Sequence, residues 1–496
     1  GQAFQWAQSI GSTAEDGGVN ITVANDGYVY HSGYFSLTAD FDPGPAVNNL
    51  SSAGLQDIYI QKLDSAGNVI WSRQIGGTGY DASTCITTDS TGNIYIGGYF
   101  KGTVDFDPNM AVFNLTSNAG SSDIFILKLD SAGNFIWAKK IGGPSNGDGV
   151  SSIALDQNKN IYTTGSFGGI VDFDPGIGTY NLTSAGSGDI FISKLDSNGN
   201  FIFAKRIGGS GSDRANAMHL DNAGNLFTTG YFSGTVDFNP NAGVYNLSGS
   251  AYLEIFIYKL DTAGNFIWAR QLGSSTNDIG NSITTDNVGN VLTTGYFSGT
   301  ADFDPGAGAY LMTASGNYHN IYVSKLDGVA GNFIWAKQIQ GSGDGEGSKI
   351  LADNSGSVYF SGYFRDTADF DPGPAFYKLN SYPYYTYNYF VSKLDMNGNF
   401  EWVEKFGYSG TMVMEGNNIY TGGTFTYTSD MDPGAGVFNL TEAGLGDIFV
   451  HKYSYCGANH DTLFNGCDSV TVYGTTYFSN NDFVVFYSDI NGCDSN

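Results

Sequence analysis

The stretch Asp-Phe-Asp-Pro-Gly at residues 172–176 decides the fold, because the chain repeats it seven times with small changes. Neighbouring copies are 61 to 67 residues apart and begin at Asp40, Asp105, Asp172, Asp237, Asp302, Asp369 and Asp430. Self-similarity at a nearly fixed period is the sequence signature of a repeat architecture. The chain is therefore predicted to consist of seven copies of one supersecondary unit.

Four short runs of alternating apolar and polar residues fill each unit. In the second unit they span residues 84–89, 93–100, 123–130 and 134–141, and we name them strands a to d. Gly92 and Gly133 stand just before strands b and d, as short β-hairpins require. Four antiparallel strands in each of seven units predict an all-β, seven-bladed β-propeller.

The two ends of the repeat predict how the ring closes. A strand d with its tryptophan, Trp6, opens the chain, whereas the seventh unit ends after its strand c at Tyr453. The N-terminal strand should therefore complete the seventh blade and remove an exposed sheet edge. We expect a propeller over residues 1–455, with blades 1 to 6 at about 11–76, 77–142, 143–208, 209–273, 274–340 and 341–407, and blade 7 at 408–455 plus 1–10.

The end of the chain has a different composition from the repeats. Residues 457–496 contain five Asp and no Lys or Arg, and Asn-Gly-Cys-Asp-Ser occurs at 465–469 and again at 491–495. We expect residues 456–496 to be the start of a small Cys-containing β repeat domain, cut short from a longer protein with further domains. Cys456, Cys467 and Cys493 could form one disulfide, with Cys467 and Cys493 as the candidate pair. Cys85 is expected to be a buried free thiol.

The propeller unit resembles the bacterial SBBP-type β-propeller repeat family. The similarity is carried by residues 92–100, Gly-Asn-Ile-Tyr-Ile-Gly-Gly-Tyr-Phe, by 123–126, Asp-Ile-Phe-Ile, and by 128–138, Lys-Leu-Asp-Ser-Ala-Gly-Asn-Phe-Ile-Trp-Ala. The C-terminal segment is similar to the Cys-Asp-Ser repeats that follow propellers in large surface proteins of Bacteroidota. The resemblance implies a mature secreted or cell-surface protein of that phylum, exported by type IX secretion, and it supplies no catalytic residues.

Composition narrows the range of partners. The 496 residues include 21 Lys and Arg against 48 Asp and Glu, which gives a formal net charge of −27. Nucleic-acid binding needs a basic surface, so nucleic acid is not expected as a partner. Direct membrane insertion is not expected either, because no run of 18 apolar residues occurs. Strong acidity suits divalent cations or basic partners instead.

Acidic residues recur in every unit and are candidate Ca²⁺ ligands, because Ca²⁺ prefers hard oxygen ligands from turns. In extended backbone Asp-x-Asp puts both carboxylates on one face. The pentad candidates are Asp40, Asp42, Asp105, Asp107, Asp172, Asp174, Asp302, Asp304, Asp369, Asp371, Asp430 and Asp432, and those that open strand c are Asp57, Asp123, Asp189 and Asp447. The alternative is that these side chains cap turns by accepting backbone N–H bonds. The loops from strand d to the next strand a add Asp16, Asp81, Asp148, Asp213 and Asp278, so the face that carries the b–c and d–a loops should be acidic.

Three neighbouring blades break the symmetry just before strand c. This loop is small or aliphatic in blades 1, 2, 3 and 7, but aromatic in blades 4 to 6. The candidate ligand-binding residues are Tyr252, Tyr318, His319, Tyr384, Tyr385 and Tyr387. Exposed tyrosines near carboxylates are typical of sugar- and peptide-binding sites. The alternative is that the rings pack on each other and stiffen a longer loop.

Asp-Ser or Asp-Thr followed by a small or aliphatic residue resembles the O-glycosylation sequence of Bacteroidota. The candidate positions are Ser65, Ser131, Thr262, Thr367, Thr462 and Ser469. A plain c–d turn is the alternative for the first three.

Enzyme signatures are lacking in the sequence. The five histidines share no position in the repeat, and no metal-spaced His pair, nucleophile elbow or phosphate-binding loop occurs. We expect a non-catalytic extracellular protein that serves in adhesion, in surface or matrix assembly, or in carbohydrate capture. Its partner would be a surface glycan or another surface or matrix protein, with Ca²⁺ as the one cofactor considered. The alternative is a polysaccharide-degrading enzyme built on a propeller.

Overall fold

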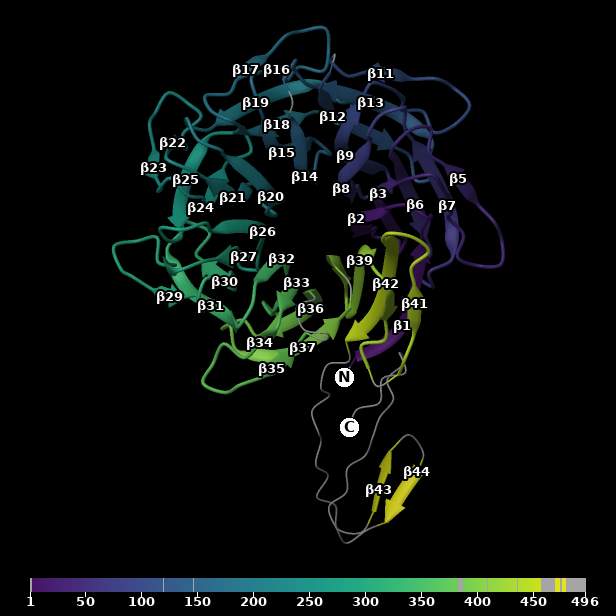
Figure 1. The fold of residues 1–496 in the computed structure, drawn as a ribbon. Helices are drawn as coiled ribbons and strands as arrows, with labels where there is room; N and C mark the ends of the chain where they lie inside the picture. Colours follow the sequence, from purple (N-terminus) through teal and green to yellow (C-terminus); the bar gives the residue numbers. More distant parts are fainter. Residues whose placement is uncertain are drawn as a thin grey trace.

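The computed structural model describes residues 2–118, 120–145, 147–381, 387–407, 409–434, 436–455, 469–472 and 475–478. Seven antiparallel sheets are arranged in a ring, and the described residues contain no helix (Figure 1). Each sheet contains four strands in the order a, b, c, d, and the sheet of blade 5 continues into a small hairpin. The predicted seven-bladed β-propeller is confirmed.

The blades are built from consecutive strands. Their bounds are, for blade 1, β2 (Gly17–Val23), β3 (Val29–Phe35), β6 (Asp57–Leu63) and β7 (Val69–Ile75); for blade 2, β8 (Ala82–Thr88), β9 (Ile94–Lys101), β12 (Ser122–Leu129) and β13 (Phe135–Ile141); for blade 3, β14 (Gly149–Leu155), β15 (Ile161–Phe167), β18 (Asp189–Leu195) and β19 (Phe201–Ile207); for blade 4, β20 (Arg214–Leu220), β21 (Leu226–Phe232), β24 (Glu254–Leu260) and β25 (Phe266–Leu272); for blade 5, β26 (Ile279–Thr285), β27 (Val291–Phe297), β30 (Asn320–Leu326) and β31 (Phe333–Gly341); for blade 6, β32 (Gly345–Ala352), β33 (Val358–Arg365), β36 (Tyr387–Leu394) and β37 (Phe400–Phe406); and for blade 7, β38 (Ser409–Glu415), β39 (Asn418–Phe425), β42 (Asp447–Tyr455) and β1 (Gln2–Ile10).

A two-stranded hairpin lies in each b–c loop and carries the pentad. These hairpins are β4 (Thr38–Asp40) with β5 (Asn49–Ser51), β10 (Thr103–Asp105) with β11 (Asn114–Thr116), β16 (Ile170–Asp172) with β17 (Asn181–Thr183), β22 (Thr235–Asp237) with β23 (Asn246–Ser248), β28 (Thr300–Asp302) with β29 (Leu311–Thr313), β34 (Thr367–Asp369) with β35 (Lys378–Asn380), and β40 (Thr428–Asp430) with β41 (Asn439–Thr441). Beyond the propeller, β43 (Ser469–Val472) pairs with β44 (Thr475–Phe478).

The pentad phenylalanine anchors each of these hairpins to its blade. In blade 1 the ring of Phe41 is fully buried and lies 5.1 Å from the ring of Phe35 on strand b and 5.3 Å from that of Tyr59 on strand c. Blades 2 to 6 bury the equivalent Phe106, Phe173, Phe238, Phe303 and Phe370, and blade 7 buries Met431. The hairpin therefore joins the core of its blade through the pentad residue and through the buried middle residue of its first strand, such as Ala39 or Val104.

Neighbouring blades are connected through the c–d turns. The Nζ of Lys62 on strand c and the Nε1 of Trp71 on strand d both donate to the backbone oxygen of Ser131, in the c–d turn of the next blade, at 3.1 and 3.3 Å. Equivalent lysine bonds join the following blades, from Lys128 to Ser197, Lys194 to Thr262, Lys259 to Gly328 and Lys325 to Met396. The strand c lysines therefore serve contacts between blades.

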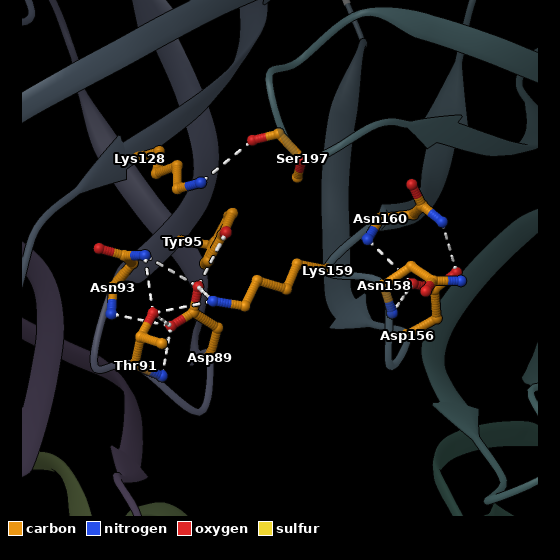
Figure 2. A network of polar contacts seen from close by, with 10 residues as sticks. All are labelled: Asp89, Thr91, Asn93, Tyr95, Lys128, Asp156, Asn158, Lys159, Asn160 and Ser197. Carbon is orange, nitrogen blue, oxygen red and sulfur yellow. Dashed lines mark hydrogen bonds and ion pairs between the residues drawn. The ribbon is translucent and has the colours of Figure 1, made fainter.

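One connection between blades departs from the repeat. Lys159, in the a–b turn of blade 3, has a φ of 61° at a position where the turn of blade 2 has Gly92. Its Nζ lies 3.2 Å from Asp89 Oδ2 and donates to Thr91 Oγ1 at 2.9 Å, across the gap between the two turns (Figure 2). The bonds to blade 2 offset the strain of a left-handed lysine, which costs roughly 1 kcal/mol.

The ring closes through the N-terminal strand, as predicted. β1 pairs with β42 in antiparallel register, with Ala7 opposite His451 and Ile10 opposite Ile448. Trp6 Nε1 and Lys452 Nζ both donate to the backbone oxygen of Ser65 in blade 1, at 3.1 and 3.0 Å. Blade 7 therefore holds blade 1 by the same contact that joins the other blades.

Deletion of residues 1–10 should open the ring. The buried side chain of Ile10 alone accounts for about 2–5 kcal/mol of unfolding free energy, and the exposed edge of β42 should promote self-association. Thermal melting and sedimentation velocity measure the two effects, and Trp6→Ala should give a smaller loss because it leaves β1 paired. A truncated protein that melts at the wild-type temperature as a monomer would contradict this closure.

Candidate functional site

An aromatic arc lies on the b–c and d–a face of blades 5 and 6. His319, just before β30, stacks on Tyr296 of β27 with the ring centroids 4.4 Å apart and the planes at 12°. Tyr387, at the start of β36, meets Tyr363 of β33 edge-on at 5.0 Å. We define the aromatic arc as these four residues together with Glu346 of β32.

Glu346 and its neighbour Gly345 connect the two ring pairs. The Glu346 carboxylate accepts a hydrogen bond from the hydroxyl of Tyr363 and another from Asn281 Nδ2, at 2.7 Å for the latter. The loop before it is tied to His319, because the backbone N–H of Gly345 donates to the His319 oxygen at 2.9 Å. The arc is therefore one connected unit formed by two adjacent blades.

Two tyrosines of the arc, Tyr296 and Tyr363, are held as neutral hydroxyls. Burial, followed by the negative charges of Glu346 and Asp278, raises the pKa of Tyr296 to about 12. Burial and the hydrogen bond to Glu346 also raise the pKa of Tyr363. The arc thus presents aromatic faces, hydroxyl groups and one carboxyl group, with 53% of Tyr387 exposed.

The sequence candidates for ligand binding have different positions in the structure. His319 and Tyr387 belong to the arc, whereas Tyr252 and Tyr318 are exposed by 54% and 37% and make no ring contact with it among the described residues. Tyr384 and Tyr385 lie outside the described residues. Tyr387 and His319 fit both the binding and the packing alternative, because their rings pack on other tyrosines and are still partly open to solvent.

Sequence reasoning missed Tyr296 and Tyr363. Both occupy the sixth position of strand b, where the repeat also has Tyr34, Tyr99 and Tyr231, so they read as structural residues. The half-buried state of this position within an otherwise buried strand is the signal that distinguishes it. Repetition therefore concealed residues that become part of a site only where neighbouring loops add partners.

The pentad carboxylates cap their own loops. Asp172 Oδ1 accepts the backbone N–H groups of Asp174 and Tyr180 at 3.1 and 2.8 Å, and Asp174 Oδ1 accepts that of Gly176 at 2.8 Å. Equivalent bonds occur in the other six pentads. Turn capping thus accounts for one oxygen of each pentad aspartate.

The acids that open strand c bind different groups from the pentads. Asp57 Oδ2 accepts the N–H of Ala53 at 3.0 Å and the amide of Gln74 at 2.7 Å, while Asp123 and Asp189 form ion pairs with Lys140 and Arg206. Among the described residues, no group of three or more His, Cys, Asp or Glu side chains is placed to hold a metal ion. Ca²⁺ normally takes six to eight oxygen ligands, and one pentad could supply only some of them. The Ca²⁺ sites therefore remain a prediction.

The aspartates of the d–a loops clamp one blade to the next. Asp81 accepts the N–H of Gly77, after strand d, and that of Lys101, at the end of the next strand b. Burial, opposed in part by such bonds and aided by nearby acids, raises the pKa of Asp81, Asp148 and Asp213 to about 6 and that of Asp278 to about 7. Burial also raises the pKa of Asp447, which opens strand c of blade 7, to about 6. The predicted acidic face thus contains carboxylates that titrate near neutral pH.

The remaining candidates fall on turns or outside the described chain. Ser65, Ser131 and Thr262 are exposed in c–d turns, and the hydroxyl of Thr367 donates to Asn380. Thr462, the side chain of Ser469 and the cysteines at 456, 467 and 493 lie outside the described residues. Cys85 is buried as a free thiol, as predicted. The part of the chain that the structure covers has no helix long and apolar enough to cross a membrane.

Substitution of Asp174 separates capping from Ca²⁺ binding. Asn239 stands at the equivalent position of blade 4 and caps Asn241 with its own Oδ1 at 3.0 Å, so Asp174→Asn should keep the cap and the melting temperature. Asp174→Ala should lower the free energy of unfolding by about 1 kcal/mol, because it removes the cap. Thermal melts in millimolar Ca²⁺ and in a chelator provide the measurement. A chelator effect that Asp174→Asn reduces would show that the pentad binds the ion.

Stability should rise as the pH falls from 8 to about 6.5. Below that pH the histidines His31, His219 and His451, whose pKa burial lowers, oppose the rise because they gain a proton only in the unfolded state. The raised carboxylates bind protons more tightly in the folded state than in the unfolded state, where their pKa is about 4, so protonation favours folding. Below about pH 4 stability should fall again, because turn bonds outweigh burial and lower the pKa of Asp64 and Asp130. Melting temperatures across this range test the prediction, and Asp278→Asn should reduce the slope between pH 8 and 6. A flat profile would contradict it.

The chain is similar to a repeat family and to several known proteins. Residues 70–99, 136–166 and 267–301 match the family model SBBP, described as a beta-propeller repeat. An uncharacterized WD repeat-containing protein, L264 of Acanthamoeba polyphaga mimivirus, is 24% identical, and the match covers 81% of this chain and 34% of L264. The regulatory protein FlaEY of Caulobacter vibrioides is also 24% identical, and the match covers 48% of this chain and 25% of FlaEY. This chain therefore spans about a third or a quarter of these relatives. The match to the solved structure of the Dos1 propeller covers 91% of this chain and 95% of the Dos1 chain, at 10% sequence identity and a TM-score of 0.42. The chain thus contains SBBP-type β-propeller repeats.

Proposed function

We propose that this chain is a non-catalytic binding protein of the cell exterior, in which the aromatic arc of blades 5 and 6 captures carbohydrate. The observation that supports the proposal is the pair of partly open ring contacts, Tyr296 with His319 and Tyr363 with Tyr387, around one oriented carboxylate. The partner would be a surface or matrix glycan, and the role would be adhesion or surface assembly.

The chemistry of the arc suits a sugar chain. Flat aromatic faces stack on the apolar face of a sugar ring, and their hydroxyl groups exchange hydrogen bonds with its rim. Glu346 is held by Tyr363 and Asn281, so it can accept sugar hydroxyls without the cost of ordering its own side chain. Two ring pairs on adjacent blades provide two places for consecutive sugar units.

A glycan array with the full chain tests the proposal. We expect binding to a defined set of glycans, and a loss of at least tenfold in Tyr387→Ser and Tyr296→Ser, because central aromatic contacts usually carry most of the binding free energy. Tyr180→Ser is the matched control, since Tyr180 is a 40% exposed tyrosine whose ring packs at a tilt against Phe201 in blade 3, away from the arc.

Two results would contradict the proposal. Equal binding by the arc variants and by wild type would remove the arc from the site. Release of reducing ends from a bound polysaccharide would favour the polysaccharide-degrading enzyme instead.

A further inference from the structure

Two cavities lie where the pentad hairpin of one blade meets strand d of the preceding blade, and Figure 1 shows these hairpins at the outer edge of the ring. Each cavity has a volume of about 330 Å³. The cavity between blades 4 and 5 is lined in part by Tyr245, Leu247, Arg270, Asp302, Asp304 and Pro305. The cavity between blades 5 and 6 has the corresponding Tyr310, Met312, Lys337, Asp369, Asp371 and Pro372. The same arrangement of side chains therefore occurs twice.

A cation without a carboxylate partner forms one wall of each cavity. The guanidinium of Arg270 donates to four neutral oxygens, namely the Tyr245 hydroxyl and the backbone oxygens of Ala269, Ala330 and Gly331. Neither Arg270 nor Lys337 forms an ion pair in the part of the chain that the structure describes. The position of Arg270 is therefore fixed, but its charge is not neutralised.

Carboxylates of the following blade form another wall. Asp302 and Asp304 each use Oδ1 to accept backbone N–H groups of their own loop, whereas Oδ2 of each makes no hydrogen bond or ion pair to any residue that the structure describes. The same is true of Asp369 and Asp371 in the second cavity. Each cavity thus has a positive wall from one blade and a negative wall from the next, and the two charges do not meet.

The combination of these groups is confined to two of the seven junctions. It requires a base on strand d, a tyrosine eight residues after the first pentad acid of the same blade, and two acids in the pentad of the next blade. Each of the other junctions lacks one of these groups, because it has Asn48, Phe113, Asn239, Glu404 or Gln8 instead. Turn capping explains the pentad in every blade, but it does not explain this combination.

We infer that each cavity binds a small zwitterion of amino-acid or dipeptide size. Its carboxylate pairs with Arg270 or Lys337, and its ammonium group pairs with the pentad carboxylates. Two opposite charges that line one space without meeting are complementary to a ligand that carries both. Leu247 and Pro305 add apolar surface for an aliphatic side chain, and a volume of about 330 Å³ is at the lower end of the range for small-molecule sites. This role is separate from carbohydrate capture by the aromatic arc.

Equilibrium dialysis of the full chain with radiolabelled L-leucine and with glycyl-L-leucine tests the inference. We expect one of these zwitterions to occupy two sites per chain, and the comparison distinguishes an amino acid from a dipeptide. N-acetyl-L-leucine lacks the ammonium group and L-leucinamide lacks the carboxylate. Each should compete at least tenfold less well than the zwitterion, because each leaves one wall of the cavity without a partner.

Asparagine variants separate binding from stability. Asp304→Asn and Asp371→Asn each remove one charge from one cavity, and asparagine keeps the cap, as Asn239 does in blade 4. Each variant should reduce the two sites to one at an unchanged melting temperature, and the double variant should bind at least tenfold more weakly. Asp107→Asn is the matched control, since it makes the same change at a junction without the tyrosine and should leave both sites intact.

Three outcomes would overturn the inference. They are the absence of binding by either zwitterion at millimolar concentration, equal competition by N-acetyl-L-leucine or L-leucinamide, and unchanged binding in the double asparagine variant. Tyr296→Ser in the aromatic arc should leave zwitterion binding unchanged, so the two proposals stand or fall separately.

Discussion

The burial of one apolar side chain from each b–c loop, an aromatic ring in six of the seven blades, is the constraint on which the rest of the structure depends. The pentad places this ring against strands b and c, so a long surface loop is fixed to the core of its blade. With Phe173 drawn inward, the flanking Asp172 and Asp174 are left outside, where they accept the backbone N–H groups of the same loop. One short motif thereby supplies both packing and capping, which explains its presence in every blade.

The ring has a second requirement, because each blade is a small sheet that must bury its faces against two neighbours. Apolar side chains fill the space between sheets, while strand c lysines and strand d tryptophans fix the c–d turn of the following blade. Lysines in a protein with net charge −27 are thus used between blades, whereas the carboxylates of the d–a loops accept backbone N–H groups on the other face. The cost of that arrangement appears in the raised pKa of the clamp aspartates such as Asp278.

Both proposed functions depend on residues that differ between the blades. In blades 5 and 6 the loops before strand c add His319 and Tyr387 to tyrosines that are present in most blades, and an ordinary repeat position becomes part of a site. At the junctions of blade 5 with blades 4 and 6, a base, a tyrosine and two pentad acids occur together, which no other junction combines. A regular scaffold tolerates such changes because its stability is distributed over seven similar blades.

The sequence by itself determined the number of blades, the strands and the closure by residues 2–10, because alternation, turn glycines and the pentad are local patterns that repeat in phase. It also indicated the aromatic sector through His319 and Tyr387. Only the tertiary structure decided which residues complete that sector, since Tyr296 and His319 are distant in sequence and meet through the pairing of β27 with β30. The tertiary structure also decided that Asp172 caps a turn and that Lys159 has a strained backbone, because the residue type specifies neither a hydrogen-bond partner nor a φ angle.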